Sequence, residues 1–314
     1  MSATSRNMYG DQGAAAPATP GSYGEAPRGY RLPATTRLGR VSLQVADLAR
    51  SQAYYEGVLG LRTLSREGAR AAFAAQGSDL PLIEINERPG ARPVPHRGRL
   101  GLYHFAILLP DRPSLGRFLR QLGTTGVRAG ASDHLVSEAL YLQDPDNLGI
   151  EVYADRPRSA WRRIGRELMM ATDPLDSAGL LQAAGEGPWT GMPPGTTIGH
   201  VHLHVGDLPT AATFYGEGLG FDRTGWSFPG ALFFGAGGYH HHVGTNTWAA
   251  AARPATDEDA RLLEWEVLVP SLRDATGALE SFAATGGTVN FEADGGTARD
   301  PWGTQVRIRA VETT

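Results

Sequence analysis

Two hydrophobic periods alternate along most of this chain. Strict alternation of apolar and polar residues predicts half-buried strands, as at residues 39–45, and a period near 3.6 predicts helices at residues 49–58 and 114–122. Asp47 stands where an N-cap would begin the first helix. Further strands in this part of the chain are predicted at residues 61–66, 71–75, 82–86, 102–109, 137–142 and 150–153. The repeated order is β-α-β-β-β.

The order recurs because the sequence repeats itself. Shifted by 160 residues, 39–48 lies on 199–208 without a gap, and Tyr55 lies on Tyr215. The repeat continues further along the chain, where residues 104–110 match 264–270. Such internal repetition is best identified before any fold is assigned. The chain is therefore expected to consist of two homologous halves, each with two modules.

Composition marks the boundaries of these halves. Residues 1–35 are rich in Ala, Gly, Pro, Ser and Thr and show no period, which predicts a disordered tail or a loosely attached arm. Residues 155–195 contain several Pro and Gly breaks and a short apolar helix near 176–184, and we interpret them as a structured connector. The two halves then span residues 36–154 and 196–314.

Composition also excludes several classes of function. The chain has 314 residues, a net charge of -4 and no basic run with interleaved aromatics, so we expect a small-molecule partner and no nucleic acid. No apolar run approaches the length of a membrane span and no signal peptide is evident, which predicts a soluble, cytoplasmic protein without a membrane partner. Because the chain has no cysteine, any metal must be bound by His, Asp or Glu.

Six of the nine histidines form two groups in β-rich sequence, His200, His202, His204 and His240, His241, His242. Side chains two residues apart on a strand point to the same face, so the first three share a face, and His240 shares one with His242. If the two strands were neighbours, these faces would line a cavity with imidazoles. Neutral imidazole is a ligand for Fe, Zn, Ni and Cu, so the pattern predicts a transition-metal site.

Several motifs carry a family resemblance. Asp47-Leu48 and Asp207-Leu208, each followed by an aromatic-Tyr pair and by Leu-Gly, resemble the vicinal oxygen chelate superfamily of glyoxalases, extradiol dioxygenases and bleomycin-resistance proteins. Within it, residues 101–112, 136–142, 149–157, 198–205 and 238–244 are similar to the two-domain catechol 2,3-dioxygenases of the Bacillus type. The resemblance implies an α+β fold in which four β-α-β-β-β modules pair into two vicinal-oxygen-chelate domains.

The resemblance also implies where metal ligands would lie. In the second half these positions hold His200, one of His240 and His242, Glu264, and Arg307, and we favour His242 as the ligand. Because Arg307 cannot bind a cation, we expect an open site with His200, His242 and Glu264 as its three ligands.

In the first half the matching positions hold Arg40, Glu84, His104 and Glu151. Because a cation occupies the first of these positions, we interpret the group as a remnant site closed by an ion pair between Arg40 and a carboxylate. Extradiol dioxygenases usually place a second histidine on the first strand of the last module and a glutamate on its last strand. Here Glu264 and Arg307 stand at those places.

These positions lead to a functional hypothesis with two alternatives. We expect an extradiol dioxygenase that uses Fe(II), or else Mn(II), to cleave an aromatic diol with O2. His240 or His202 would take a proton, and Asn246, Trp248 and Arg307 would line the substrate pocket. The alternatives are a glyoxalase-like or hydroquinone-cleaving metalloenzyme, and a metal-free binding or resistance protein. The sequence leaves a homo-oligomer open.

Overall fold

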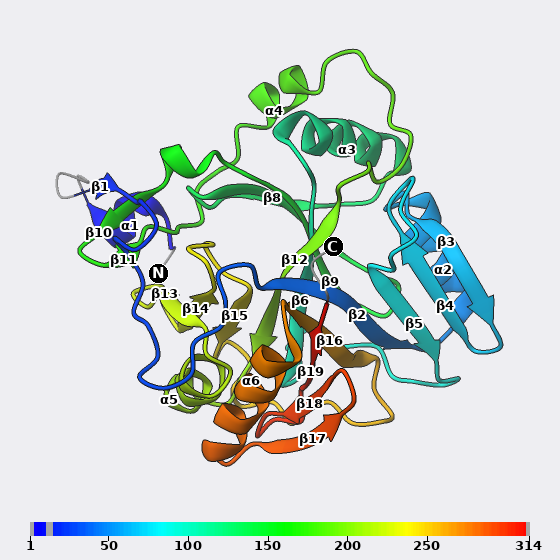
Figure 1. The fold of residues 1–314 in the computed structure, drawn as a ribbon. Helices are drawn as coiled ribbons and strands as arrows, with labels where there is room; N and C mark the ends of the chain where they lie inside the picture. Colours follow the sequence, from blue (N-terminus) through cyan, green and yellow to red (C-terminus); the bar gives the residue numbers. More distant parts are fainter. Residues whose placement is uncertain (1–2, 11–14, 312–314) are drawn as a thin grey trace.

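The computed structural model describes residues 3–10 and 15–311, and four β-α-β-β-β modules make up most of it (Figure 1). The first contains β2 (Arg37–Val45), α2 (Leu48–Gly57), β3 (Arg62–Glu67), β4 (Arg70–Ala74) and β5 (Ile83–Glu87). The second contains β6 (Gly101–Leu108), α3 (Arg112–Thr125), β7 (Gly130–Asp133), β8 (Ser137–Gln143) and β9 (Gly149–Asp155). Asp47 caps α2 as predicted, since its side chain accepts a hydrogen bond from the backbone N–H of Arg50.

The other two modules follow a connecting segment. The third contains β12 (Thr197–His204), α5 (Leu208–Ala211), the π-helical turn η2 (Ala212–Gly218), β13 (Asp222–Gly225), β14 (Ala231–Gly235) and β15 (Val243–Asn246). The fourth contains β16 (Arg261–Val269), α6 (Leu272–Ala284), β17 (Thr288–Glu292), β18 (Gly295–Arg299) and β19 (Gln305–Ala310). In the described part of the chain, no helix is long and apolar enough to cross a membrane.

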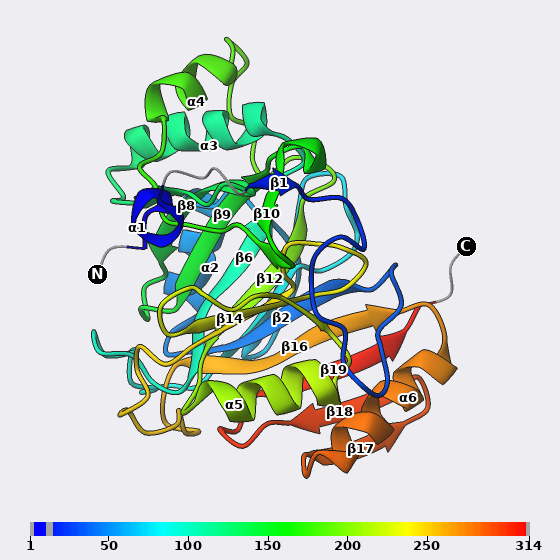
Figure 2. The same ribbon diagram turned by 90° about the vertical axis from the view of Figure 1, so that its left-hand side faces the viewer.

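The modules pair into two eight-stranded sheets, and each sheet takes one module from each half of the chain. One sheet has the order β13-β14-β15-β12-β6-β9-β8-β7 and the other β17-β18-β19-β16-β2-β5-β4-β3. The second module thus joins the third through antiparallel β6 and β12, while the first joins the fourth through β2 and β16. The predicted fold class is confirmed, but residues 36–154 and 196–314 do not each form a sheet of their own. Figure 2 shows β2 and β16 crossing behind β6 and β12.

The hydrophobic core lies between the two sheets and under their helices. Alternate residues of the central strands, such as Val41, Phe105 and Val201, are fully buried in one cluster that draws on both sheets. Since side chains alternate across a strand, the residues between them face the opposite side of each sheet. On the β6–β12 sheet this opposite face carries His104, His200, His202 and His204, and we call it the histidine face.

Two matching tyrosine–aspartate pairs connect the sheets. The Tyr55 hydroxyl lies 3.2 Å from Asp144 Oδ2, and the Tyr215 hydroxyl lies 2.5 Å from Asp300 Oδ2. Each tyrosine lies on the helical segment of one module, α2 or η2, and each aspartate lies in a turn of the next module. Asp144 also accepts hydrogen bonds from the backbone N–H groups of Asp146 and Leu148, as expected for turn chemistry. Each pair therefore joins two consecutive modules that belong to different sheets.

The N-terminal segment, for which a disordered tail or a loosely attached arm was expected, is packed over residues 3–10 and 15–35. It forms α1 (Ser5–Tyr9) and β1 (Ala16–Pro17), and β1 pairs with β10 (Arg162–Ile164). Tyr23 is buried in a cluster with Trp161 and Met170 of the connector. The apolar side chains scattered in this segment suffice to attach it, although they show no period.

The segment that was interpreted as a connector joins the second module to the third. It contains η1 (Arg158–Ala160), β10, β11 (Glu167–Leu168) and α4 (Ser177–Ala183). The helix α4 packs beside α3, where the backbone of Leu180 lies close to Gly116 (Figure 1). Together with the N-terminal segment, the connector covers one end of the histidine face.

Candidate metal centre

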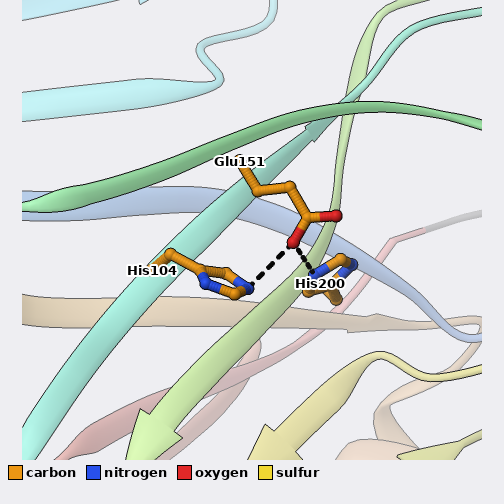
Figure 3. A group of neighbouring side chains, drawn as sticks. All are labelled: His104, Glu151 and His200. Atoms are coloured by element: carbon orange, nitrogen blue, oxygen red, sulfur yellow. Dashed lines mark hydrogen bonds and ion pairs between the residues drawn. The ribbon is translucent and has the colours of Figure 1, made fainter. Parts of the chain in front are cut away.

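Three neighbouring strands bring two histidines and a glutamate together (Figure 3). His104 is on β6, Glu151 on β9 and His200 on β12, and β6 lies between the other two strands. Glu151 Oε2 lies 3.0 Å from His104 Nε2 and 3.1 Å from His200 Nε2. One ligand atom from each residue lies within 4.8 Å of the other two. His104 and Glu151 come from the second module and His200 comes from the third, so the group exists only because these two modules pair.

A β-bulge shapes this part of the sheet. His202 pairs with His104, but the next pair joins Leu203 to Leu102, so Tyr103 is an extra residue on β6. Bulges re-aim side chains and are common beside active sites. The Tyr103 ring consequently lies on the histidine face, with its centroid 4.8 Å from that of His104 and 5.2 Å from that of His202.

The bulge also requires a glycine at the start of β9. A Cβ atom at Gly149 would lie 2.0 Å from the Tyr103 carbonyl oxygen, which no side chain could tolerate. Gly149 therefore allows β9 to approach the bulge, and this approach places Glu151 beside His104.

Burial sets the charge states of the three side chains. Each is at most 4% exposed. Burial lowers the pKa of His104 and of His200, so both imidazoles are neutral near pH 7, the form that binds metal. Burial by itself would raise the pKa of Glu151, but the interactions with His200 and His104 outweigh it and hold that pKa well below its usual range. The group thus presents two neutral imidazoles and one carboxylate.

These donors fit a divalent transition metal. His104 Nε2 is buried and lies 3.0 Å from Glu151 Oε2 without the geometry of a hydrogen bond. Among the described residues, buried His200 Nδ1 has no hydrogen-bond partner. Buried polar atoms without partners are costly, and a cation between the three side chains would satisfy the first of them. Two histidines and one carboxylate form the donor set of non-haem Fe(II) oxygenases. A divalent metal is therefore suggested by the donors, and they leave its identity open.

The structure does not bring His200 together with His242 and Glu264. His242 Nδ1 accepts a hydrogen bond from the Ala236 N–H, and its ring packs beside Phe221 on the core side of the sheet. Glu264 is on β16 in the other sheet, where it pairs with Arg307 at 3.2 Å. Of the predicted ligands, only His200 lies in the His–Glu–His group.

The second histidine group also differs from its predicted orientation. Residues 240–242 precede β15, which begins at Val243, so strand alternation does not apply to them. His241, rather than His242, faces the site, and its ring centroid lies 4.2 Å from that of His200. The predicted proton acceptors both lie near the group: the ring of His202 is 5.0 Å from that of His104, and the ring of His240 is 6.1 Å from that of His200.

A chain of hydrogen bonds extends from the site toward the surface. His241 Nδ1 lies 2.7 Å from His240 Nδ1, and His240 Nε2 lies 2.9 Å from Asp155 Oδ1. The Asp155 carboxylate is 28% exposed, whereas the His240 side chain is fully buried. The Tyr239 hydroxyl is 3.3 Å from the same carboxylate oxygen.

On the other side of the group, Tyr141 and His134 form a second polar pair. The Tyr141 hydroxyl lies 2.6 Å from His134 Nε2, and His134 Nδ1 lies 2.7 Å from the Ala171 carbonyl oxygen. Burial raises the pKa of Tyr141 well above its ordinary value, and the nearby Glu151 raises it further. The hydroxyl is therefore neutral near pH 7 and can act as a hydrogen-bond donor.

A cleft of about 1270 Å³ leads to His104. Tyr103, Tyr141 and Trp248 are among the residues that line it. Trp248, which was expected from the sequence in a substrate pocket, is one of these lining residues. Asn246 does not line the cleft, and its Oδ1 accepts hydrogen bonds from His204 Nδ1 and from the Trp248 N–H. Arg307 lies on β19 in the other sheet.

His104 and Glu151 were assigned by sequence to a remnant site with Arg40 and Glu84. The expected ion pair exists, since Arg40 Nε lies 3.1 Å from Glu84 Oε2, but it belongs to the other sheet together with Glu264 and Arg307. One signal could have corrected the assignment. Pairing the second module with the third restores the two histidines and terminal glutamate usual in extradiol dioxygenases.

Comparison with known proteins decides the family. The sequence profile of the Glyoxalase/Bleomycin resistance protein/Dioxygenase superfamily matches residues 37–152 and 197–308. The chain belongs to this superfamily. A curated member, the catechol-2,3-dioxygenase of Bacillus subtilis (strain 168), is 46% identical over 237 residues, which cover 74% of this chain and 82% of the relative. The resemblance seen in the sequence is thereby confirmed.

Two solved structures have the same fold as this chain. A candidate dioxygenase from Bacillus subtilis aligns with a TM-score of 0.59 and 15% identity over 90% of this chain and 86% of its own. Glyoxalase I from Zea mays aligns with a TM-score of 0.52 and 16% identity over 88% of this chain and 92% of its own. At this identity the matches support the architecture alone.

Proposed function

We propose that this superfamily member is a metal-dependent extradiol dioxygenase that cleaves catechol or a substituted catechol with O2. The buried group of His104, Glu151 and His200 carries the proposal, because two histidines and one carboxylate suit Fe(II), with Mn(II) as the alternative. The 46% identity to a catechol-2,3-dioxygenase supports this reaction class. When bound, such an ion would supply open coordination positions for both diol oxygens and for O2.

The position that matches Glu151 in the third module supports an open site. Ala106 pairs with Glu151 across β6 and β9, and His202 pairs with Gly244 across β12 and β15. Gly244 therefore occupies the place of a fourth protein ligand and offers no side chain. Glyoxalase I sites generally use four ligands, so we favour ring cleavage over a glyoxalase-like reaction. The three ligands leave room for a substrate that binds through two oxygens.

His241 is the proton acceptor that this arrangement favours. If the Asp155 carboxylate accepts the Nε2–H of His240, then His240 Nδ1 carries a lone pair and accepts the Nδ1–H of His241. His241 Nε2 is then left with a lone pair next to His200. Burial lowers the pKa of His241 well below its ordinary value, so the ring is neutral near pH 7 and free to take a diol proton. Asp155 and His240 act as positioning residues.

Anaerobic purification with Fe(II) tests the proposal. We expect about one iron per chain, and oxygen uptake with catechol that yields a yellow ring-opened product. Glu151→Gln and His104→Ala should lose both metal and oxygen uptake, whereas Glu264→Gln, which removes a carboxylate from the other sheet, should retain them.

Two results would contradict the dioxygenase. Stoichiometric metal without oxygen uptake would indicate a different metal-dependent reaction, such as hydroquinone cleavage or isomerisation. A folded protein that binds no metal under these conditions would instead indicate a binding protein. Circular dichroism of each variant separates loss of the site from loss of the fold.

A further inference from the structure

We propose that the preferred substrate bears a carboxylate, which Arg97, Arg99 and Arg128 bind in the cleft that leads to His104. The inference rests on the proposed function and specifies its substrate class. Arg97 and Arg99 come from the segment between β5 and β6, and Arg128 comes from the segment between α3 and β7. All three line the same cleft as Tyr103 and His104.

The charges along the cleft are strongly one-sided. Besides the three arginines, His96 and His204 line it, and Asp144 is its one acidic residue among those the structure describes. Asp144 is 3% exposed, and its carboxylate is occupied by backbone N–H groups and by the Tyr55 hydroxyl. Its charge is therefore unavailable to the arginines. A cleft lined by charges of one sign concentrates ligands of the opposite sign.

The three guanidinium groups are also without carboxylate partners. Within residues 3–10 and 15–311, no ion pair involves Arg97, Arg99 or Arg128. Arg99 Nε is buried and has no hydrogen-bond partner among the described residues, and Arg99 Nη1 donates to the Gly98 carbonyl oxygen. Other arginines of this chain do pair, for example Arg112 with Glu138 at 2.5 Å. A planar guanidinium fork matches a carboxylate with two parallel hydrogen bonds.

The size of the cleft also favours a substrate larger than catechol itself. Ligand pockets typically measure about 300–1000 Å³. The volume of about 1270 Å³ here is far more than a single catechol ring fills. At the mouth, Trp248 is 49% exposed and Tyr103 is 38% exposed, with their ring centroids 5.4 Å apart. These rings offer an apolar wall for a side chain that joins the catechol ring to its carboxylate.

A matched pair of diols tests the inference. 3-(3,4-Dihydroxyphenyl)propanoate and the neutral 4-propylcatechol have the same chain length and differ in the terminal carboxylate. With the iron-loaded enzyme, we expect kcat/KM to favour the propanoate. Arg99→Gln, and the double variant Arg97→Gln with Arg128→Gln, should each reduce this preference about 10- to 100-fold, the range for one lost charge-assisted contact. Arg273→Gln, an exposed charge on α6, should leave it unchanged.

A binding measurement separates this inference from the proposed function. Calorimetric titration of metal-free protein with the propanoate should show binding that weakens at high salt and in Arg99→Gln. If oxygen uptake occurs but both diols react equally, the carboxylate site is refuted and the dioxygenase stands. If arginine-dependent binding occurs without oxygen uptake, the carboxylate site stands and the dioxygenase is refuted. Equal binding of both diols by metal-free wild-type protein would overturn the site by itself.

Discussion

The buried His242 should make the metal-free protein sensitive to acid, and His242→Gln should remove its part of that sensitivity. Burial, followed by the influence of His240, His200 and Arg158, lowers the pKa of His242 from 6.5 to about 3. Its Nδ1 accepts the Ala236 N–H, so a proton there would break this hydrogen bond. In the unfolded chain His242 takes up a proton near pH 6.5, whereas in the folded chain it stays neutral down to about pH 3.

The sign and size of the effect follow from this difference. Because the pKa is lower in the folded state, the stabilisation is fully present above pH 6.5 and is lost as the pH falls toward 3. Between pH 7.5 and pH 5.0 the loss from this residue is about 2 kcal/mol. At pH 7.5, His242→Gln should be less stable by about 2 to 4 kcal/mol, because the ring that packs on Phe221 and Tyr239 is lost. At pH 5.0 that deficit should shrink by about 2 kcal/mol.

Urea unfolding in the presence of EDTA measures both proteins at each pH. Comparing variant with wild type cancels other titrating groups, such as Asp144, whose pKa burial raises to about 7. Phe221→Leu is the matched control, since it disturbs the same cluster without removing a titratable group and should give a pH-independent difference. A deficit of His242→Gln that stays constant from pH 7.5 to 5.0 would refute the reasoning.

Three further predictions concern the site and its supports. Asp155→Asn should lower kcat about tenfold or more with iron content unchanged, because His240 no longer orients His241. Tyr239→Phe, which keeps the carboxylate, should lower kcat less, and equal effects would contradict the positioning role of Asp155. Metal-free Glu151→Gln should bind iron at least about 100-fold more weakly by titration, and retained affinity would rule out this ligand. Tyr55→Phe should lower the free energy of unfolding in urea by about 1–2 kcal/mol, because Asp144 loses a donor. Tyr54→Phe should cost less, because the buried Tyr54 hydroxyl has no hydrogen-bond partner in the part of the chain that the structure describes, and equal costs would count against the link between the sheets.

The N-terminal segment shows the limit of periodicity as a signal. Residues 15–35 lack any regular hydrophobic pattern, yet Tyr23 is buried and its hydroxyl donates to the Gly238 carbonyl oxygen at 2.6 Å. Isolated aromatic residues can attach an irregular segment to a surface that the rest of the fold provides. Hydrophobic periods predict helices and strands, but they do not predict contacts made by isolated side chains in irregular segments.

The sequence by itself determined the modules. Alternation, the Asp47 cap and the internal repeat depend on residues close together in the chain or on direct matches between segments, and these predicted the strands, the helices and the module order. The superfamily was indicated by the motifs that resemble it. Alternation also placed His200, His202 and His204 on one face of β12. It failed for His240 to His242, because they precede the strand that they were expected to belong to.

Only the tertiary structure decided which modules share a sheet. A repeat shows that two segments are alike, but the choice of partner strand depends on hydrogen bonds between residues far apart in sequence. Because β6 pairs with β12 and β2 with β16, Glu264 and Arg307 belong to the same sheet as Arg40 and not to the sheet of His200. The same pairing brings His104 and Glu151 to His200. The residue types of the proposed ligands were readable from the sequence, and their combination was fixed by strand pairing across the two halves.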